Sequence, residues 1–243
     1  MTDRLIPKAF RPTPINLFEF AMSQGTKLPG RLGYLCDRKL KRRLRKRMQG
    51  PFLDVLADTG AGDLCLDLGA NQGEFTRKLA ETGADVIAFE PDPVAYAVLE
   101  ANCGSLDNVT LHKKAVSTED TQMMLRRTAN WTDKNALKRS VSSSIVHNDA
   151  GMSDAHGEMV DVVDLLRFMT ELDRNIRIIK MDVEGAEWDI LQALLDHPVL
   201  DRIDCMFVET HQRCDPARCI PLFNDLENRA LALDRPYINL YWV

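Results

Sequence analysis

Carboxylates stand at four places in the sequence where an apolar run ends, and this arrangement is typical of a binding crevice. Each lies at or directly after a run long enough for a buried strand; the four are Asp67, Glu90, Asp182 and Glu209. The carboxyl ends of the strands in an open α/β sheet face the ligand crevice, so these side chains can converge there. Negative charge in such a crevice suits a cationic or amine-bearing ligand better than a pyrophosphate.

The first of these carboxylates opens the run D-L-G-A-N-Q-G at residues 67–73, between a predicted strand and a predicted helix. Gly69 allows a tight turn after the strand, and Gly73 allows the backbone to approach a ligand closely. The free N–H groups at the start of the following helix can bind a polar ligand. The dinucleotide fingerprint G-x-G-x-x-G is absent, which weakens the case for an NAD-dependent oxidoreductase.

Glu90 lies at the end of the second predicted strand, 17 residues after Gly73. At this place an acidic side chain can accept hydrogen bonds from two ribose hydroxyls. The alternative is a cap for the helix that begins after Pro91. Together with the glycine-bearing loop, the position of Glu90 favours the ribose role.

A denser acidic group follows the apolar run 176–181, within the segment I-I-K-M-D-V-E-G-A-E. Carboxylates at the end of a buried strand are costly unless they are solvated, paired or functional. We predict that Asp182 serves catalysis and binds the cofactor amine, and that Glu184 binds substrate hydroxyls. Capping of the next helix is the alternative for both residues. Lys180 is expected to point away or to pair with a carboxylate.

His211 ends the run F-V-E-T-H at residues 207–211 and is the one histidine at a predicted crevice position. A neighbouring carboxylate can orient an imidazole and raise its pKa. We therefore expect His211 to act as a general base oriented by Glu209. A divalent metal held by Asp182, Glu209 and His211 is a chemical alternative, but the sequence has no dedicated metal-ligand spacing, and we predict no metal.

The elements that must position these residues alternate between strand and helix from residue 52 onward. The predicted strands are 64–68, 86–89, 109–111, 176–181, 203–208 and 238–243, and the predicted helices are 74–81, 93–102, 165–172, 186–195 and 220–233. This order implies right-handed crossovers and a mostly parallel sheet. Residues 121–163 interrupt the pattern and are expected to form an insertion of antiparallel strands and loop.

Residues 1–50 differ from the rest and are predicted to form an N-terminal extension, with residues 51–243 as the main domain. A short apolar helix is expected over 15–22. A second helix is expected over 38–48, with Gly50 and Pro51 as its stop signal. Its run R-K-L-K-R-R-L-R-K-R at 38–47 creates a local basic patch, although the whole chain carries a formal charge of -5.

The composition is that of an ordinary globular protein, with 45% hydrophobic and 28% charged residues in 243. No apolar run reaches the length of a membrane span, and the N-terminus does not resemble a secretory signal, so a cytoplasmic location is expected. The six cysteines form no C-x-x-C pair. We expect Cys65 and Cys205 to be buried as small apolar residues in strands.

The motifs together resemble the FkbM family of S-adenosylmethionine-dependent methyltransferases. The resemblance rests on L-C-L-D-L-G-A-N-Q-G, I-A-F-E-P-D, I-K-M-D-V-E-G-A-E and F-V-E-T-H, which cover roughly residues 64–211. It implies a class I methyltransferase (Rossmann-like) fold with a doubly wound, mostly parallel sheet, and O-methylation of sugars or other metabolites. It also implies that Asp67, Gly69, Asn71 and Gly73 line the methionine end of the cofactor, that Glu90 holds the ribose, and that Ala115 borders the adenine.

The expected function is therefore S-adenosylmethionine-dependent methylation of a hydroxyl on a sugar, a glycan or a small metabolite. One alternative is an RNA methyltransferase that grips phosphates with the basic segment 38–47. The same segment could contact an anionic membrane surface, or it could be a solvated helix with Leu40 and Leu44 packed on the core. A non-catalytic cofactor-binding module is the alternative outside enzymes.

Overall fold

The protein is described by a computed structural model that covers residues 4–9, 11–26, 28, 30–132, 137, 143–146, 152–211 and 216–242. Its centre is a sheet of six strands in the order β3-β2-β1-β7-β8-β9, in which every described pairing is parallel. The strands are β1 Leu64–Leu68, β2 Asp85–Phe89, β3 Val109–His112, β7 Ile176–Met181, β8 Ile203–Glu209 and β9 Tyr237–Trp242. The predicted fold class is confirmed, and each predicted core strand is found.

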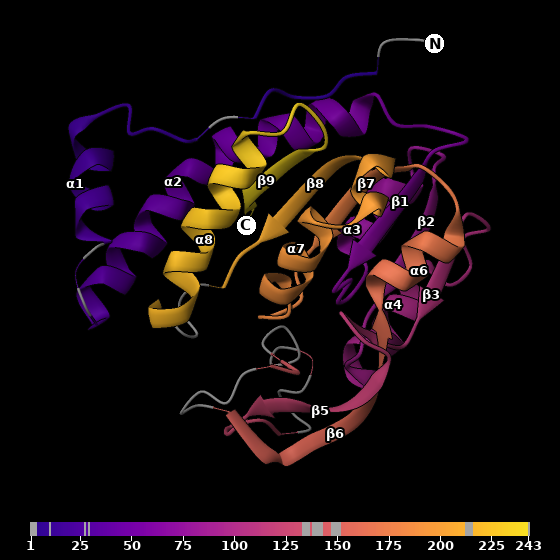
Figure 1. Ribbon diagram of the computed structural model, residues 1–243. Helices are drawn as coiled ribbons and strands as arrows, with labels where there is room; N and C mark the ends of the chain where they lie inside the picture. Colours follow the sequence, from indigo (N-terminus) through magenta and orange to yellow (C-terminus); the bar gives the residue numbers. More distant parts are fainter. Residues whose placement is uncertain are drawn as a thin grey trace.

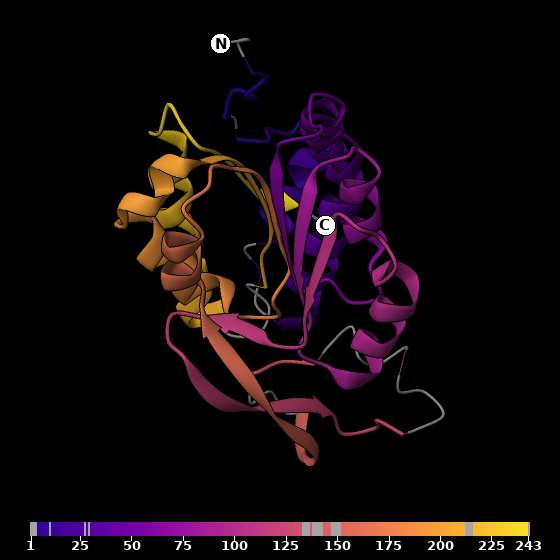
Figure 2. The same cartoon turned by 90° about the vertical axis from the view of Figure 1, so that its right-hand side faces the viewer.

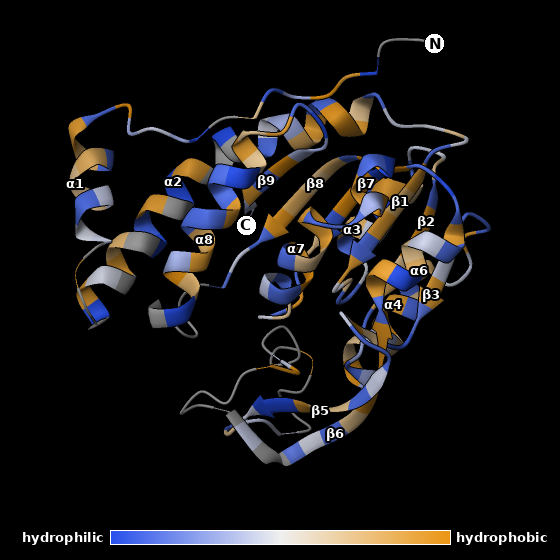
Figure 3. Cartoon of the chain, viewed as in Figure 1, coloured by the Kyte–Doolittle hydropathy of each residue, from blue (hydrophilic) through white to orange (hydrophobic). Residues whose placement is uncertain are grey.

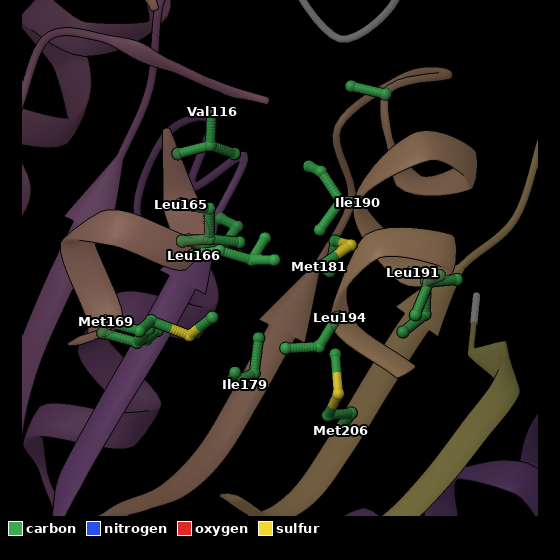
Figure 4. Close-up of a cluster of buried hydrophobic side chains, with 14 of the residues drawn as sticks. Val116, Leu165, Leu166, Met169, Ile179, Met181, Ile190, Leu191, Leu194 and Met206 are labelled. Atoms are coloured by element: carbon green, nitrogen blue, oxygen red, sulfur yellow. The ribbon is translucent and has the colours of Figure 1, made fainter. Parts of the chain in front are cut away.

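The sheet lies between two layers of helices, which explains why its strands are apolar on both faces (Figures 1 and 2). One layer contains α2 Gly30–Ala57, α3 Glu74–Ala80 and α4 Pro93–Cys103, and the other contains α6 Leu165–Leu172, α7 Glu187–Leu195 and α8 Pro216–Leu231. Side chains of β7 such as Ile179 and Met181 meet Ile190 and Leu194 of α7 in this second layer (Figure 4). The described strands of the central sheet are correspondingly hydrophobic (Figure 3).

The chain reverses its direction across the sheet between β1 and β7. From β1 it proceeds outward to β2 and β3, and it then returns to place β7 on the other side of β1. At such a reversal the loops after the two central strands separate and leave a crevice at their carboxyl ends. The candidate site is built there.

The insertion and the preceding strand β4 together form a second, smaller sheet beyond the carboxyl ends of the central strands (Figure 1). Its strands are β4 Ala115–Ser117, β5 Thr121–Thr128 and β6 Met152–Asp164, in the order β4-β6-β5. β5 and β6 are antiparallel, as predicted, whereas β4 runs parallel to β6.

Two contacts tie this insertion to the core. Arg127 of β5 pairs with the buried carboxylate of Asp92 through two nitrogens, each at 3.2 Å, and the Ser143 hydroxyl donates to the same carboxylate at 2.9 Å. The Ser144 hydroxyl donates to the carbonyl oxygen of Glu184 at 2.6 Å. The insertion is therefore anchored to the loops after both β2 and β7.

The N-terminal region contains α1 Leu17–Gly25, followed by the long helix α2. The prediction that α2 stops at Gly50 and Pro51 was wrong, because the helix continues through both residues to Ala57. Proline removes one helical hydrogen bond and crowds the preceding turn. Burial of Phe52 and Val55 against Phe207 and Trp242 favours the helix beyond this point. The boundary predicted at residue 50 thus falls inside a continuous helix.

No helix in the described ranges combines the length and the apolar character that a bilayer crossing requires. Five cysteines are described, all as buried free thiols: Cys36, Cys65, Cys103, Cys205 and Cys219. Cys65 and Cys205 lie in β1 and β8 as expected, and burial raises the pKa of each thiol to about 12. Cys214 lies outside the described residues.

Candidate active site

A pocket lies at the carboxyl ends of β1, β2 and β7, between the core and the insertion. The core side contains six residues that the sequence had singled out: Gly69, Asn71, Glu90, Ala115, Asp182 and Glu184. The opposite side comes from the insertion, through Leu125, Ser143 and Ile145, which the sequence did not reveal. Their pattern carries no chemical motif, and only the folding of the insertion over the strand ends brings them to the pocket.

The loop after β1 is shaped by backbone conformations that place it against β7. Gly69 has a φ of 78°, and a Cβ at this position would lie 1.8 Å from the carbonyl oxygen of Asp182. Its N–H and that of Ala70 donate to the carbonyl oxygen of Phe89 at 3.0 and 2.9 Å. Glycine is required at residue 69 because no side chain fits between the two loops.

Glu90 connects the loops after β1 and β2. One carboxylate oxygen accepts from the N–H of Asn71 and the other from the N–H of Asp92, both at 2.8 Å. Burial raises the pKa of Glu90 to about 7, against the opposing effect of these hydrogen bonds. Each oxygen can accept a further hydrogen bond, and Glu90 lines the pocket, so its position is compatible with the predicted contact to ribose hydroxyls.

Asp67 does not reach the pocket, contrary to its predicted place beside the ligand. Its carboxylate is fully buried, accepts from the Thr76 hydroxyl at 2.7 Å and pairs with Lys180 at 3.2 Å. The contact with Asp67 confirms that Lys180 pairs with a carboxylate, and its ammonium also donates to the carbonyl oxygen of Gly69 at 2.6 Å. Buried charges require partners, so Asp67 and Lys180 neutralise each other and stabilise the loop after β1 on the side away from the pocket.

Gly73 is also absent from the pocket wall. It precedes α3 with a φ of 88°, and a Cβ there would lie 2.8 Å from atoms of both Leu99 and Cys103. The close packing of α3 against α4 therefore requires glycine at this position.

Asp182 and Glu184 line the pocket, and the buried His211 lies beside them. The imidazole Nε2 of His211 lies 3.2 Å from Glu184 and 3.8 Å from Asp182. Glu184 has a φ of 47°, a conformation that residues with side chains rarely adopt and that costs about 1 kcal/mol. Such backbone strain persists where the surrounding structure fixes it, often at functional sites.

Glu187, rather than the expected Glu209, orients His211. The Glu187 carboxylate lies 3.1 Å from Nδ1 and accepts from the backbone N–H of His211 at 2.8 Å. β8 ends at Glu209, so the two-residue alternation that would place residues 209 and 211 on one side no longer applies. In the sequence, Glu187 stands between the apolar residues Ala186 and Trp188, and this is the signal that could have indicated a buried carboxylate. The structure shows that all three residues are buried.

The carboxylates around His211 determine its charge. Burial alone would lower the pKa of His211, but the hydrogen bond with Glu187 and the charges of Glu184 and Asp182 raise it to about 9. His211 is therefore protonated at neutral pH in this environment and donates rather than accepts. This opposes the prediction that it acts as the general base.

The same cluster offers ligand atoms to a metal ion. One atom each from Asp182, Glu184 and His211 lie within 4.8 Å of one another. Glu184 takes the place that the sequence-based alternative gave to Glu209.

Two buried oxygen atoms in the pocket wall have no hydrogen-bond partner among the described residues. They are Oδ1 of Asn71 and Oδ1 of Asp182, and both can only accept. A buried acceptor without a partner is costly, so a ligand that donates hydrogen bonds would stabilise this wall.

The parallel sheet, the glycine-bearing loop after β1 and the acidic strand ends define a class I methyltransferase fold. The chain belongs to the FkbM methyltransferase family, whose model, described as the methyltransferase FkbM domain, matches residues 67–229. The predicted family is thus confirmed. The match covers both Glu90 and the cluster around His211.

Individual relatives are more distant. Methyltransferase 1 of Beauveria bassiana is 28% identical over 186 residues, which cover 70% of this chain and 74% of that protein. Ribosomal RNA small subunit methyltransferase A of Thermotoga neapolitana is 30% identical over 95 residues, or 38% of this chain and 33% of that one. The crystal structure of methyltransferase FkbM from Methylobacillus flagellatus aligns with a TM-score of 0.46 and 14% identity, over 87% of this chain. This chain spans about half the length of that protein, 52%.

Proposed function

We propose that this methyltransferase uses S-adenosylmethionine to methylate a hydroxyl group of a sugar, a glycan or another hydroxylated metabolite. The observation that carries the proposal is the pair of partnerless acceptors in the pocket wall, Oδ1 of Asn71 and Oδ1 of Asp182. They suit a ligand that donates, such as an ammonium group. The three carboxylates of the wall, Glu90, Asp182 and Glu184, favour a cationic ligand over a pyrophosphate.

The core side of the pocket supplies the cofactor contacts. Glu90 accepts hydrogen bonds from the ribose hydroxyls, while Asn71 and Asp182 accept from the amine. Ala115 and Ile145 both line the pocket and offer apolar surface to the adenine. When bound, S-adenosylmethionine supplies an electrophilic methyl group on a sulfonium.

The acidic end of the pocket receives the acceptor. Glu184 and Asp182 accept hydrogen bonds from its hydroxyl groups, and Glu184 takes the proton that the reacting oxygen loses. His211 is a positioning residue: held by Glu187, it donates to Glu184 and balances the negative charge of the cluster. This arrangement orients the hydroxyl for an in-line displacement.

Calorimetric titration tests the cofactor assignment. We expect S-adenosylmethionine to bind and NAD not to bind, and Glu90→Ala to weaken the affinity about 100-fold through the loss of two charge-assisted hydrogen bonds. Glu100→Ala, an exposed change on α4, is the control and should leave the affinity unchanged. Binding of NAD alone would refute the proposal.

Transfer of radiolabel from methyl-labelled S-adenosylmethionine tests the acceptor class. Label should appear in hydroxylated sugars or glycans, and Glu184→Gln should lower kcat about 100-fold with unchanged cofactor affinity. Label found in ribosomal RNA instead would replace the hydroxylated metabolite with an RNA acceptor. Cofactor binding without transfer to any acceptor would favour a non-catalytic module.

A further inference from the structure

Exposed apolar side chains gather on the N-terminal helix pair. Among the described residues, seven of the twelve exposed large hydrophobic residues lie within residues 15–35. The most exposed are Leu17 at 82% and Ile15 at 69%. We call this surface the apolar tip and define it by Ile15, Leu17, Phe20, Leu28, Leu32 and Leu35. A cluster of this kind on a globular protein marks an interaction surface.

The outward face of α1 is uncharged over its whole length. Leu17, Phe20, Ala21 and Gln24 follow the i, i+3, i+4, i+7 spacing of one helix face and are all exposed. Glu19, on the opposite side of the helix, and Gly25, at its last position, are buried. Burial of Gly25 beside Cys36 of α2 fixes this orientation, because a Cβ at residue 25 would lie 2.4 Å from the Cys36 sulfur. The apolar side chains are thus held outward by the packing of the helix pair.

Positive charge adjoins the apolar tip along α2. Leu35, Lys39 and Arg42 share one exposed helix face, and Arg38 and Arg43 are exposed beside it. The carboxylate of Glu19 is buried and pairs with Arg47 at 2.9 Å, so it does not neutralise the exposed cations. The helix pair therefore presents cations next to apolar side chains in a chain of net charge -5.

The apolar tip is placed apart from the core. In the second half of α2, Phe52 and Val55 pack against strand residues of the central sheet. In contrast, α1 and the first turns of α2 project at one edge of the molecule (Figure 1). In the same view the last turn of α1 and the first turn of α2 lie on the side to which the arrowheads of β1 and β8 point. The carboxyl end of β1, beside which the pocket lies, thus faces the same side as the start of α2.

We propose that the helix pair docks on an anionic membrane surface. The apolar tip enters the boundary between head groups and acyl chains, and Arg38, Lys39 and Arg42 contact lipid phosphates. Nucleic acid would use the cations but not the uncharged outward face of α1. In a symmetric dimer formed through the apolar tip, the cations beside the tip would come from both copies and would repel one another. The proposal is independent of which acceptor the pocket binds.

Vesicle co-sedimentation with the full-length protein tests this proposal. Binding is expected to vesicles of equal parts phosphatidylcholine and phosphatidylglycerol, with little binding to phosphatidylcholine alone and weaker binding in high salt. The triple change Arg38→Gln, Lys39→Gln and Arg42→Gln should lower the partition coefficient about 100-fold. The pair Leu17→Ser and Phe20→Ser should lower it at least about tenfold, because apolar insertion is lost.

Two changes elsewhere on the surface form the control: Met159→Ser and Lys113→Gln remove one exposed apolar and one exposed cationic side chain. They should leave vesicle binding unchanged, and equal thermal melting of all variants shows that folding is intact. Absence of wild-type binding to the anionic vesicles would overturn the proposal. So would a dimer in solution that Leu17→Ser and Phe20→Ser dissociate, or RNA binding that depends on the three cations while vesicle binding does not.

Discussion

Two parts of the pocket are held in place by different kinds of interaction. The cofactor side, formed by the loops after β1 and β2, depends on backbone geometry: Gly69 lets its loop approach the carbonyl oxygen of Asp182, and backbone N–H groups fix Glu90. The acidic side depends on charge, with the His211 imidazole between Glu187 and Glu184. The cofactor side therefore keeps its geometry without a ligand, because backbone contacts fix it. The stability of the acidic side, in contrast, depends on the protonation of His211.

The largest loss of stability is expected from Gly69→Ala, which disturbs the backbone geometry of the loop after β1. A methyl group would contact the Asp182 carbonyl at 1.8 Å in a left-handed conformation, and we expect a loss of about 4 kcal/mol in the free energy of unfolding. Gly62→Ala is the matched control, since Gly62 has a φ of 91° with no atom within 4 Å of the added Cβ, and it should cost only about 1 kcal/mol. Urea denaturation measures both, and equal losses would show that close packing at Gly69 is unimportant.

Removal of the buried pair that joins the insertion to the loop after β2 should have the next largest effect. Arg127→Ala leaves the Asp92 carboxylate buried without its cation, and we expect a loss of about 3 kcal/mol. Arg167→Ala breaks an exposed pair with Asp120, which solvent screens, and should cost much less. The same denaturation measurements compare them. If both changes cost the same, the insertion is not anchored through Asp92.

The pH dependence of stability probes the acidic side. The pKa of His211 is raised to about 9, above the value near 6.5 in the unfolded chain, so its stabilising contribution is complete below pH 6.5. It is lost progressively as the pH rises to 9, and we expect a fall of about 3 kcal/mol over this window. Denaturation at a series of pH values measures the slope. His211→Gln should remove this slope, and a wild-type stability that stays constant between pH 6.5 and 9 would contradict the assigned environment.

The smallest expected effect concerns the cofactor side. With a pKa of about 7, Glu90 is mostly protonated at pH 6 and mostly ionised at pH 8. Ribose hydroxyls donate to the ionised form, so affinity for S-adenosylmethionine should rise about tenfold over this range. Calorimetry at the two pH values measures the rise. Glu90→Gln should bind weakly and show no such rise; a rise that persists in this variant would assign the titration to another group.

Much of the fold was predictable because its signals are local. The strands of the parallel sheet are buried on both faces, so each is a continuous apolar run, and glycines and prolines mark the ends of most elements. Gly69, Asn71 and Glu90 were found for the same reason, since each follows a recognisable strand. The end of α2 was not predictable, because a local stop signal at Pro51 was outweighed by burial of Phe52 and Val55 in the core.

The partners of the charged residues required long-range contacts that no spacing shows. Glu187 and His211 lie on different elements and meet only when α7 packs beside β8. Asp67 was predicted to face the ligand, yet strand residues alternate between faces, and Lys180 on the neighbouring strand determines that its carboxylate is used internally.

The sequence by itself determined the order of the elements, the parallel sheet, the family and the acidic character of the strand ends, since these depend on residue type and short spacing. Only the tertiary structure decided which carboxylates face the pocket, which partner holds His211, and which apolar side chains remain exposed on α1. The physical reason is that burial and charge pairing depend on distances between segments far apart in the chain, and those distances are fixed only when the layers pack.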